Sequence, residues 1–274
     1  MSAKIFIHQI FYDGASKKAL DPGFIPLDNT QNLKPDWYEF WPMRNFLLQK
    51  TLDKDAWYGF LSPKFQEKTG LNSQYIHTLL NNFDLNADVA LFSPGWDQLA
   101  YFQNPFEQGE VWHPGISELS QSIFNKIGVS INLDSLVTHS MTSVFSNYIV
   151  AKPNFWNEWL FIANKLYDAL ETGKPPESSL LTTYGSPANQ APMKTFIQER
   201  LASVVLSQSK FNVISPDFSQ LAPIFERIFS NDPKTRRMLQ TCDLLKENYC
   251  NTNDSSYLDM YKKIRAEIPF KKPY

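Results

Sequence analysis

Three short apolar runs, separated by helical patterns, constrain the fold of this 274-residue chain more than any other feature. Residues 4–12, 56–62 and 89–92 are rich in β-branched and aromatic side chains, and we expect each run to be a buried strand. The segments between them, residues 36–50 and 73–83, have apolar residues at helical spacing. This βαβαβ order predicts a mostly parallel sheet that is covered by helices.

The remaining segments extend this α/β pattern toward the C-terminus. We expect helices at 116–126, from Pro153 to Gly173, at 193–206 and in three stretches after Asp217, and strands at 130–134, 139–152 and 211–214. Residues 15–36 and 172–192 are rich in proline, and the second of these stretches is also rich in small polar residues. We interpret both as loops, and the second as a candidate lid over a site.

The predicted fold class is therefore α/β, with a mixed sheet flanked by helices. We assign residues 1–215 to one domain with this sheet, and residues 216–274 to a helical C-terminal extension packed on the same domain.

Composition excludes several classes of function. A formal net charge of −2 argues against a nucleic-acid binder, which would carry a basic excess. Two cysteines provide neither a disulfide framework nor a zinc site. The sequence contains no phosphate-binding P-loop, no GxGxxG motif and no GxSxG elbow. The N-terminal apolar run is too short for a signal peptide, so we expect a cytoplasmic protein.

Residues 88–115, DVALFSPGWDQLAYFQNPFEQGEVWHPG, contain five aromatic residues after the strand, interleaved with amides and carboxylates. Aromatic faces beside polar groups suit a hydroxyl-rich ligand such as a sugar. The alternative is an irregular segment whose aromatic residues belong to the core. From this segment we take these substrate-binding candidates: Trp96, Tyr101, Glu107, Trp112 and His113. His113 is equally consistent with a structural role.

Four short motifs, in this order along the chain, resemble GT-A-type sugar transferases from bacterial polysaccharide and lipopolysaccharide gene clusters. They are IHQIF at 7–11, WYGFLSPKF at 57–65, SNYIVAKPNFWNEWLFI at 146–162 and MKTFIQERLASVVL at 193–206. The resemblance spans roughly residues 4–206. It implies a GT-A-like, Rossmann-like sheet and transfer of a sugar from a nucleotide donor, with UDP-sugars favoured, to a bacterial surface glycan.

One departure from that family concerns metal binding. Many members carry an Asp-x-Asp motif after the third strand, where carboxylates hold a divalent metal against the donor diphosphate. Here Asp88 precedes the strand and Asp97 follows it, with no Asp-x-Asp. Either Asp97 holds a metal with a distant partner, or lysine and arginine neutralise the diphosphate. The sequence leaves both routes open.

The reaction needs a base for the acceptor hydroxyl and positive charge for the leaving diphosphate. The catalytic candidates are Glu199, from the ERL segment, and Asp97 and Glu110 from the aromatic segment. For the diphosphate we consider Lys152 and Arg200, although ordinary ion pairs explain both. The complete set assigned to the donor is His8, Asp13, Tyr58, Gly59, Asp88, Gln98, Asn147, Lys152 and Arg200. Asp13 is also explained as a turn cap, and His8 as a core residue.

Two alternatives remain. A glycoside hydrolase would use Glu107 and Glu110, or Asp97, as its carboxylate pair. A non-catalytic protein would use the aromatic segment only to recognise glycans. The basic end KKIRAEIPFKKPY leaves open a peripheral contact with the inner membrane face or with other glycan-assembly proteins, although a solvated helix end explains it equally well.

Overall fold

The computed structural model describes residues 4–82, 86–171, 180–184 and 186–272. The three expected strands form: β1 (Ile5–Phe11), β3 (Trp57–Leu61) and β4 (Val89–Leu91). The helices expected between them are also present, as α2 (Phe40–Gln49) and α4 (Ser73–Asn82). The short helix η1 (Pro35–Trp37) precedes α2.

Six strands of the described chain form one mixed sheet in the order β2-β1-β3-β5-β4-β8. The additional strands are β2 (Ile25–Asp28), β5 (Ile149–Ala151) and β8 (Val213–Ile214). Strand β5 is antiparallel to both of its neighbours, and the other pairings are parallel. The expected mixed α/β sheet flanked by helices is therefore confirmed.

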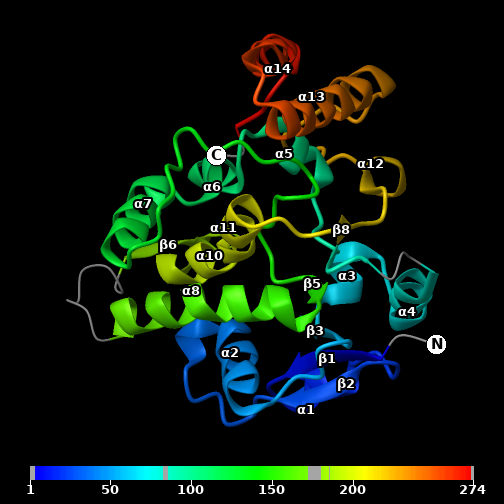
Figure 1. Cartoon of the computed structure of the whole chain (residues 1–274), viewed down its shortest axis with the longest axis vertical. Helices are drawn as coiled ribbons and strands as arrows, with labels where there is room; N and C mark the ends of the chain where they lie inside the picture. Colours follow the sequence, from blue (N-terminus) through cyan, green and yellow to red (C-terminus); the bar gives the residue numbers. More distant parts are fainter. Residues whose placement is uncertain (1–3, 83–85, 172–179, 185, 273–274) are drawn as a thin grey trace.

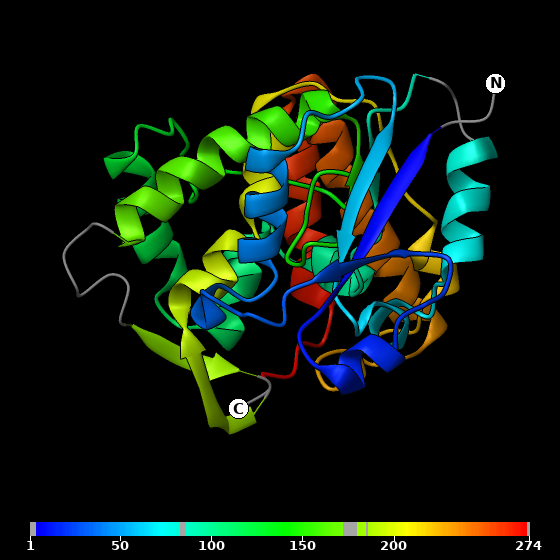
Figure 2. The ribbon, with the colours of Figure 1, turned by 90° about the horizontal axis from the view of Figure 1, so that it is seen from below.

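Alternate residues of the central strands face two different apolar layers, as the two-residue period of a strand requires. Val89 and Leu91 pack in one layer with α2 and with α8 (Pro153–Glu171). Ala90 packs in the other layer with α3 (Phe65–Thr69) and α4. Figure 2 shows α2 and α8 on one side of β1 and β3, and α4 on the other. Helices on both faces explain why β3 and β4 are apolar throughout and why β1 is mostly apolar.

Several sequence expectations were wrong. The aromatic segment is mostly helical, with α5 (Trp96–Tyr101) and α6 (Pro105–Trp112), because Asn104 accepts from two backbone amides of the first turn of α6. Residues 130–134 form no strand, and only the last part of 139–152 does.

The two expected loops also contain regular structure. The stretch 15–36 contains most of α1 (Gly14–Lys18) and the edge strand β2. The candidate lid includes a hairpin of β6 (Leu181–Tyr184) and β7 (Ser186–Pro192), whereas residues 172–179 lie outside the described part.

The other expected helices are confirmed, with one interruption. Helix α7 (Ile116–Lys126) and α8 form as single helices. The segment 193–206 forms two helices, α10 (Met193–Gln198) and α11 (Leu201–Gln208), with a break at Glu199 and Arg200.

The C-terminal helices pack mainly against α5 (Figure 1). They are α12 (Phe218–Leu221), α13 (Pro233–Thr252) and α14 (Ser255–Glu267), the three expected after Asp217. Trp96, Tyr101 and Phe102 share one apolar cluster with residues from these helices. Tyr101, a substrate candidate, stacks on Phe270 with ring centres 5.3 Å apart. The aromatic side chains of α5 therefore serve mainly to join the C-terminal helices to the rest of the chain.

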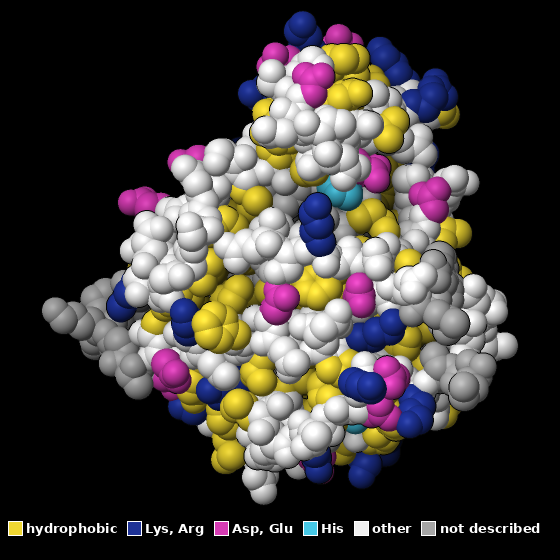
Figure 3. Space-filling model, viewed as in Figure 1, with side chains coloured by type: hydrophobic (Ala, Val, Ile, Leu, Met, Phe, Trp, Pro, Cys, Tyr) yellow, Lys and Arg dark blue, Asp and Glu magenta, His cyan; other side chains and the backbone are white. Residues whose placement is uncertain are grey.

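The face in Figure 3 shows basic and acidic side chains intermixed, without an extended area of one sign. Among the helices that the structure describes, none is both long enough and apolar enough to cross a membrane.

Candidate functional site

A cavity of about 430 Å³ opens where the carboxyl ends of β3 and β4 meet the amino end of β5. Phe60 and Ser62 line it from the end of β3, Pro94 from the turn after β4, and residues 145–148 from the segment before β5. Ligands of open α/β sheets bind beyond the carboxyl ends of their strands. The position of this cavity, together with its polar lining, makes it the candidate site.

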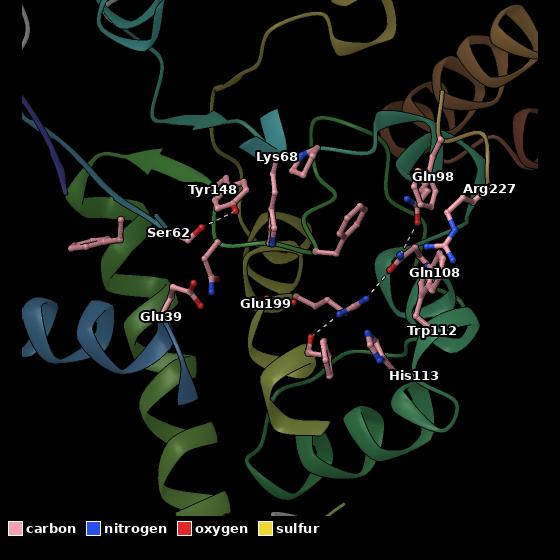
Figure 4. Close-up of a pocket in the computed structure, with 18 residues that line it drawn as sticks. Glu39, Ser62, Lys68, Gln98, Gln108, Trp112, His113, Tyr148, Glu199 and Arg227 are labelled. Carbon is pink, nitrogen blue, oxygen red and sulfur yellow. Dashed lines mark hydrogen bonds between the residues drawn. The ribbon is translucent and has the colours of Figure 1, made fainter. Parts of the chain in front are cut away.

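Figure 4 shows the arrangement of the polar groups in this cavity. Glu39, Ser62 and Tyr148 lie on one side, the residues Gln98, Gln108, Trp112 and Arg227 lie on the other, and Lys68 and Glu199 lie between them. The lining therefore comes from α2, α3, α5, α6, the α10–α11 break and the segment after α12. Residues far apart in sequence meet here, so no single motif could reveal the site.

Glu199 occupies the two-residue break between α10 and α11. The Arg200 amide donates to the Ile197 carbonyl, three residues back, so the helix tightens at this point. Glu199 lines the cavity and is only half-buried. Loss of water raises the pKa of its carboxyl to about 7; Glu39 raises it further, whereas Arg200 and Lys68 oppose the rise. A carboxyl that titrates near neutral pH is suited to accept or donate a proton.

Glu39 is the second carboxylate of the cavity. It lies immediately before α2, after Tyr38, whose positive φ of 48° turns the chain from η1 into the helix. Burial raises the pKa of Glu39 as well, and Lys68 and Lys64 oppose that rise. The pocket therefore contains two carboxyl groups, and the charge of Glu39 disfavours ionisation of Glu199.

Arg200 lies beside Glu199 in sequence, but its guanidinium is buried and bound to other protein groups. Its three nitrogens each donate at 2.7 Å, to the carbonyls of Pro105 and Phe196 and to Oε1 of Gln108. Burial lowers the pKa of Arg200 to about 10. A Cβ atom at Gly109 would lie 3.1 Å from the guanidinium, so this glycine leaves the space that Arg200 occupies. Arg200 thus joins the α10–α11 break to α6, which fixes the backbone that carries Glu199.

Amide and aromatic groups complete the lining. Gln108 donates to Gln98 at 2.9 Å, and Asn147 donates to Gln198 at 3.0 Å. The buried Oδ1 of Asn147 accepts no hydrogen bond from any described residue, which leaves an acceptor for a ligand. The His113 ring stacks on Phe196 with centres 3.6 Å apart. Of the sequence candidates, the cavity brings together Glu199, Arg200, Gln98, Asn147, Trp112 and His113.

Asp97 does not line this cavity but an adjoining one of about 520 Å³. The residues that line both cavities are Lys68, Pro94, Gln98, Phe145 and Phe225. Oδ2 of Asp97 accepts from the Phe225 amide at 2.6 Å, which fixes the segment that carries Phe225 and Arg227. Burial raises the pKa of Asp97. The structure thus gives Asp97 a positioning contact, and a metal or catalytic role for it stays a prediction.

The other sequence candidates lie outside the cavity, and a ligand role for each stays a prediction. Asp13 caps α1, and Glu110 accepts from the amides of Gly115 and Ser117. Glu107 binds Arg265 through both carboxylate oxygens. Trp96 and Tyr101 belong to the cluster with the C-terminal helices.

The remaining donor candidates lie within the sheet or at its opposite edge. His8 packs between the rings of Phe46 and Phe60. The Tyr58 hydroxyl accepts from the Asp53 amide, and the space at Gly59 is filled by Val150. Asp88 and Lys152 flank the amino end of β4 and the carboxyl end of β5, at the edge away from the cavity.

Sequence reasoning missed several lining residues, among them Glu39, Ser62, Lys68, Phe145, Tyr148 and Arg227. The segment SPKFQEKTG after β3 contained a usable signal, because polar and basic residues that follow a buried parallel strand lie at the ligand-binding edge. Glu39 and Arg227 gave no comparable signal, since only tertiary packing brings them to this edge.

No group of three or more His, Cys, Asp or Glu side chains in the described ranges could hold a metal ion. No family model matches the sequence, and no curated protein matches it. Among solved structures, the chain is similar to the apo structure of WbbM, a bifunctional glycosyltransferase, with a TM-score of 0.44 and 17% identity. The match covers 77% of this chain and 44% of the WbbM chain. At that TM-score the likeness does not establish a shared fold.

Proposed function

We propose that this protein is a glycosyltransferase with a GT-A-like arrangement, which moves a sugar from a nucleotide-sugar donor to a glycan acceptor. One observation carries the proposal: at the carboxyl edge of an open α/β sheet, two carboxylates face a polar cavity, and the Glu199 carboxyl has a pKa of about 7. The short motifs that resemble bacterial polysaccharide enzymes favour a UDP-sugar donor and a surface polysaccharide or lipopolysaccharide acceptor.

In this mechanism Glu199 is the base. Its carboxylate takes the proton of an acceptor hydroxyl as that oxygen forms a bond to the anomeric carbon of the donor sugar. The bond between the anomeric carbon and the diphosphate oxygen breaks, and its electron pair leaves with the diphosphate. Burial keeps the pKa of Glu199 high, the Glu39 charge adds to that rise, and the Glu39 carboxylate accepts from sugar hydroxyls. Trp112 and Tyr148 offer aromatic faces for sugar rings, and Gln98 and Asn147 offer amide groups.

The first test is thermal stabilisation of the purified chain by nucleotides. UDP, GDP, CMP and dTDP, and their sugars, are added with and without Mn²⁺. A ligand at one hundred times its dissociation constant adds about 2.7 kcal/mol to the free energy of unfolding, which raises Tm measurably. We expect UDP and UDP-sugars to give the largest shift.

Absence of a shift with every nucleotide would contradict the proposal. The same two carboxylates would then favour a glycoside hydrolase, because such enzymes also use a pair of acidic side chains, one protonated and one ionised. Cleavage of aryl glycosides that depends on Glu39 and Glu199 would support that second function. Stabilisation by oligosaccharides without turnover would indicate a glycan-binding protein.

A further inference from the structure

Lys68 is a basic residue that lines the cavity together with Glu39 and Glu199 and forms no salt bridge with a described residue. It belongs to α3, which follows β3 at the ligand-binding edge, and it reaches down into the cavity (Figure 4). It also lines the adjoining cavity that contains Asp97, so the Lys68 side chain borders both cavities. A ligand that extends from one cavity into the other would pass this group.

The charges around Lys68 are incompletely balanced. Its ammonium acts on both carboxyls, since it lowers the pKa of Glu39 and of Glu199. Yet it forms no salt bridge with any residue in the described part of the chain. Its Nζ atom lies 5.9 Å from the centre of the Tyr148 ring. The ammonium therefore retains hydrogen-bond donors for an incoming anion.

The basic residues expected from sequence do not fulfil this role. The Arg200 guanidinium is buried, and each of its three nitrogens already donates to a carbonyl or to Gln108. Lys152 lies at the opposite edge of the sheet, with Nζ 5.5 Å from the centre of the Trp57 ring. Arg227 lines the first cavity on the wall opposite Glu39, beside Gln98, and does not line the adjoining cavity (Figure 4).

We propose that Lys68 binds the phosphate groups of the donor and stabilises the diphosphate as it leaves. This inference rests on the proposed function. When the anomeric bond breaks, negative charge develops on the departing phosphate oxygen, and a fixed ammonium within hydrogen-bond distance lowers the energy of that state. Glu199 receives the acceptor proton at the same time, so Lys68 keeps its own proton throughout.

The test measures binding of inorganic pyrophosphate and of UDP by calorimetry, with EDTA present, to the unmodified chain and to four variants. Lys68→Gln removes the charge and keeps most of the length. Lys68→Arg restores the charge. Lys64→Gln removes an exposed lysine from the same segment that does not line the cavity. Arg227→Gln removes the cation of the opposite wall.

We expect Lys68→Gln to weaken pyrophosphate binding roughly tenfold or more, the range for a lost charge-assisted hydrogen bond, with Tm unchanged because Lys68 is exposed. Lys68→Arg restores most of the affinity, and the two controls change it less than about threefold, since neither removes a direct hydrogen bond to the anion.

Unchanged binding in Lys68→Gln would overturn the inference. Equal losses in Lys68→Gln and Arg227→Gln would also overturn it, because they would indicate only a general positive potential. Pyrophosphate binding that requires added Mn²⁺ would overturn the inference as well. Pyrophosphate binding that depends on Lys68 without any preference for a nucleotide would instead support the anion site and contradict the proposed glycosyltransferase.

Discussion

Two groups of charged side chains in this protein have opposite characters. In the C-terminal cluster, Lys246 donates to the carbonyls of Leu99 and Phe102 at 2.5 and 2.6 Å, and Arg265 forms a bidentate pair with Glu107. In the cavity, Glu39, Glu199 and Lys68 influence each other without forming a salt bridge among the described residues.

The difference shows why a shifted pKa alone does not identify a functional site. Burial lowers the pKa of Lys246 to about 8, and burial raises the pKa of Glu199 to about 7. Both are displaced toward neutrality, yet only Glu199 faces a cavity. Lys246 is fully buried and satisfies carbonyls at the end of α5, where helix carbonyls need donors. Its role is structural, whereas the incomplete hydrogen bonding of the cavity groups leaves them available to a ligand.

The largest expected effect is on catalysis by Glu199. Glu199→Gln keeps the shape of the side chain but cannot accept a proton, so we expect the rate of nucleoside diphosphate release to fall roughly 10²- to 10⁴-fold. Rates with a UDP-sugar and a glycan acceptor measure it. Glu118→Gln, on an exposed position of α7, is the matched control and retains full activity. Full activity in Glu199→Gln would contradict the assignment of Glu199 as the catalytic base.

For Lys246 in the C-terminal cluster, we predict that substitution lowers stability but leaves nucleotide binding intact. Lys246→Met keeps most of the apolar length but leaves two buried carbonyls without their donor, so we expect the free energy of unfolding to fall by about 3 kcal/mol. Urea unfolding measures the change, and Lys262→Met, at an exposed position of α14, is its control. Nucleotide affinity at a temperature where both variants are folded is expected to stay unchanged. If Lys246→Met were as stable as the unmodified chain but no longer bound nucleotide, the structural role assigned to Lys246 would be wrong.

The third prediction concerns the pH dependence of stability. The pKa of Glu199 is higher in the folded chain than its usual value of 4.5, so the folded state holds the proton more tightly than the unfolded state. Stability therefore declines as pH rises from 4.5 to 7 and stays lower above that window. We expect Glu199 to contribute a decline of about 2 kcal/mol between pH 5 and pH 8, and Glu199→Gln to abolish that part. Thermal unfolding across this range measures it. Identical pH profiles for the two proteins would show that Glu199 titrates normally.

Local sequence patterns determined most of the framework. The apolar runs that became β1, β3 and β4 carry β-branched and aromatic residues, and helices α4, α7 and α8 follow their apolar spacing. These patterns work because the periods of strands and helices place one defined set of side chains on the buried face, whichever segment packs against that face. They failed at β2, whose four residues include a proline and gave no strand pattern. They also failed across residues 96–112, where aromatic residues suggested an irregular binding segment instead of two short helices.

The candidate site divides in the same way. The sequence alone indicated an α/β sheet. It also indicated five residues that line the cavity: Glu199 as a candidate base, and Asn147, Gln98, Trp112 and His113 as polar or aromatic candidates. It could not indicate that the Arg200 guanidinium is buried in structural hydrogen bonds, or that the charges of Glu39 and Lys68 act on Glu199. Those facts depend on the antiparallel insertion of β5 and on the packing of α2 and α3. Charges interact through space, so their partners are decided only when distant segments fold together.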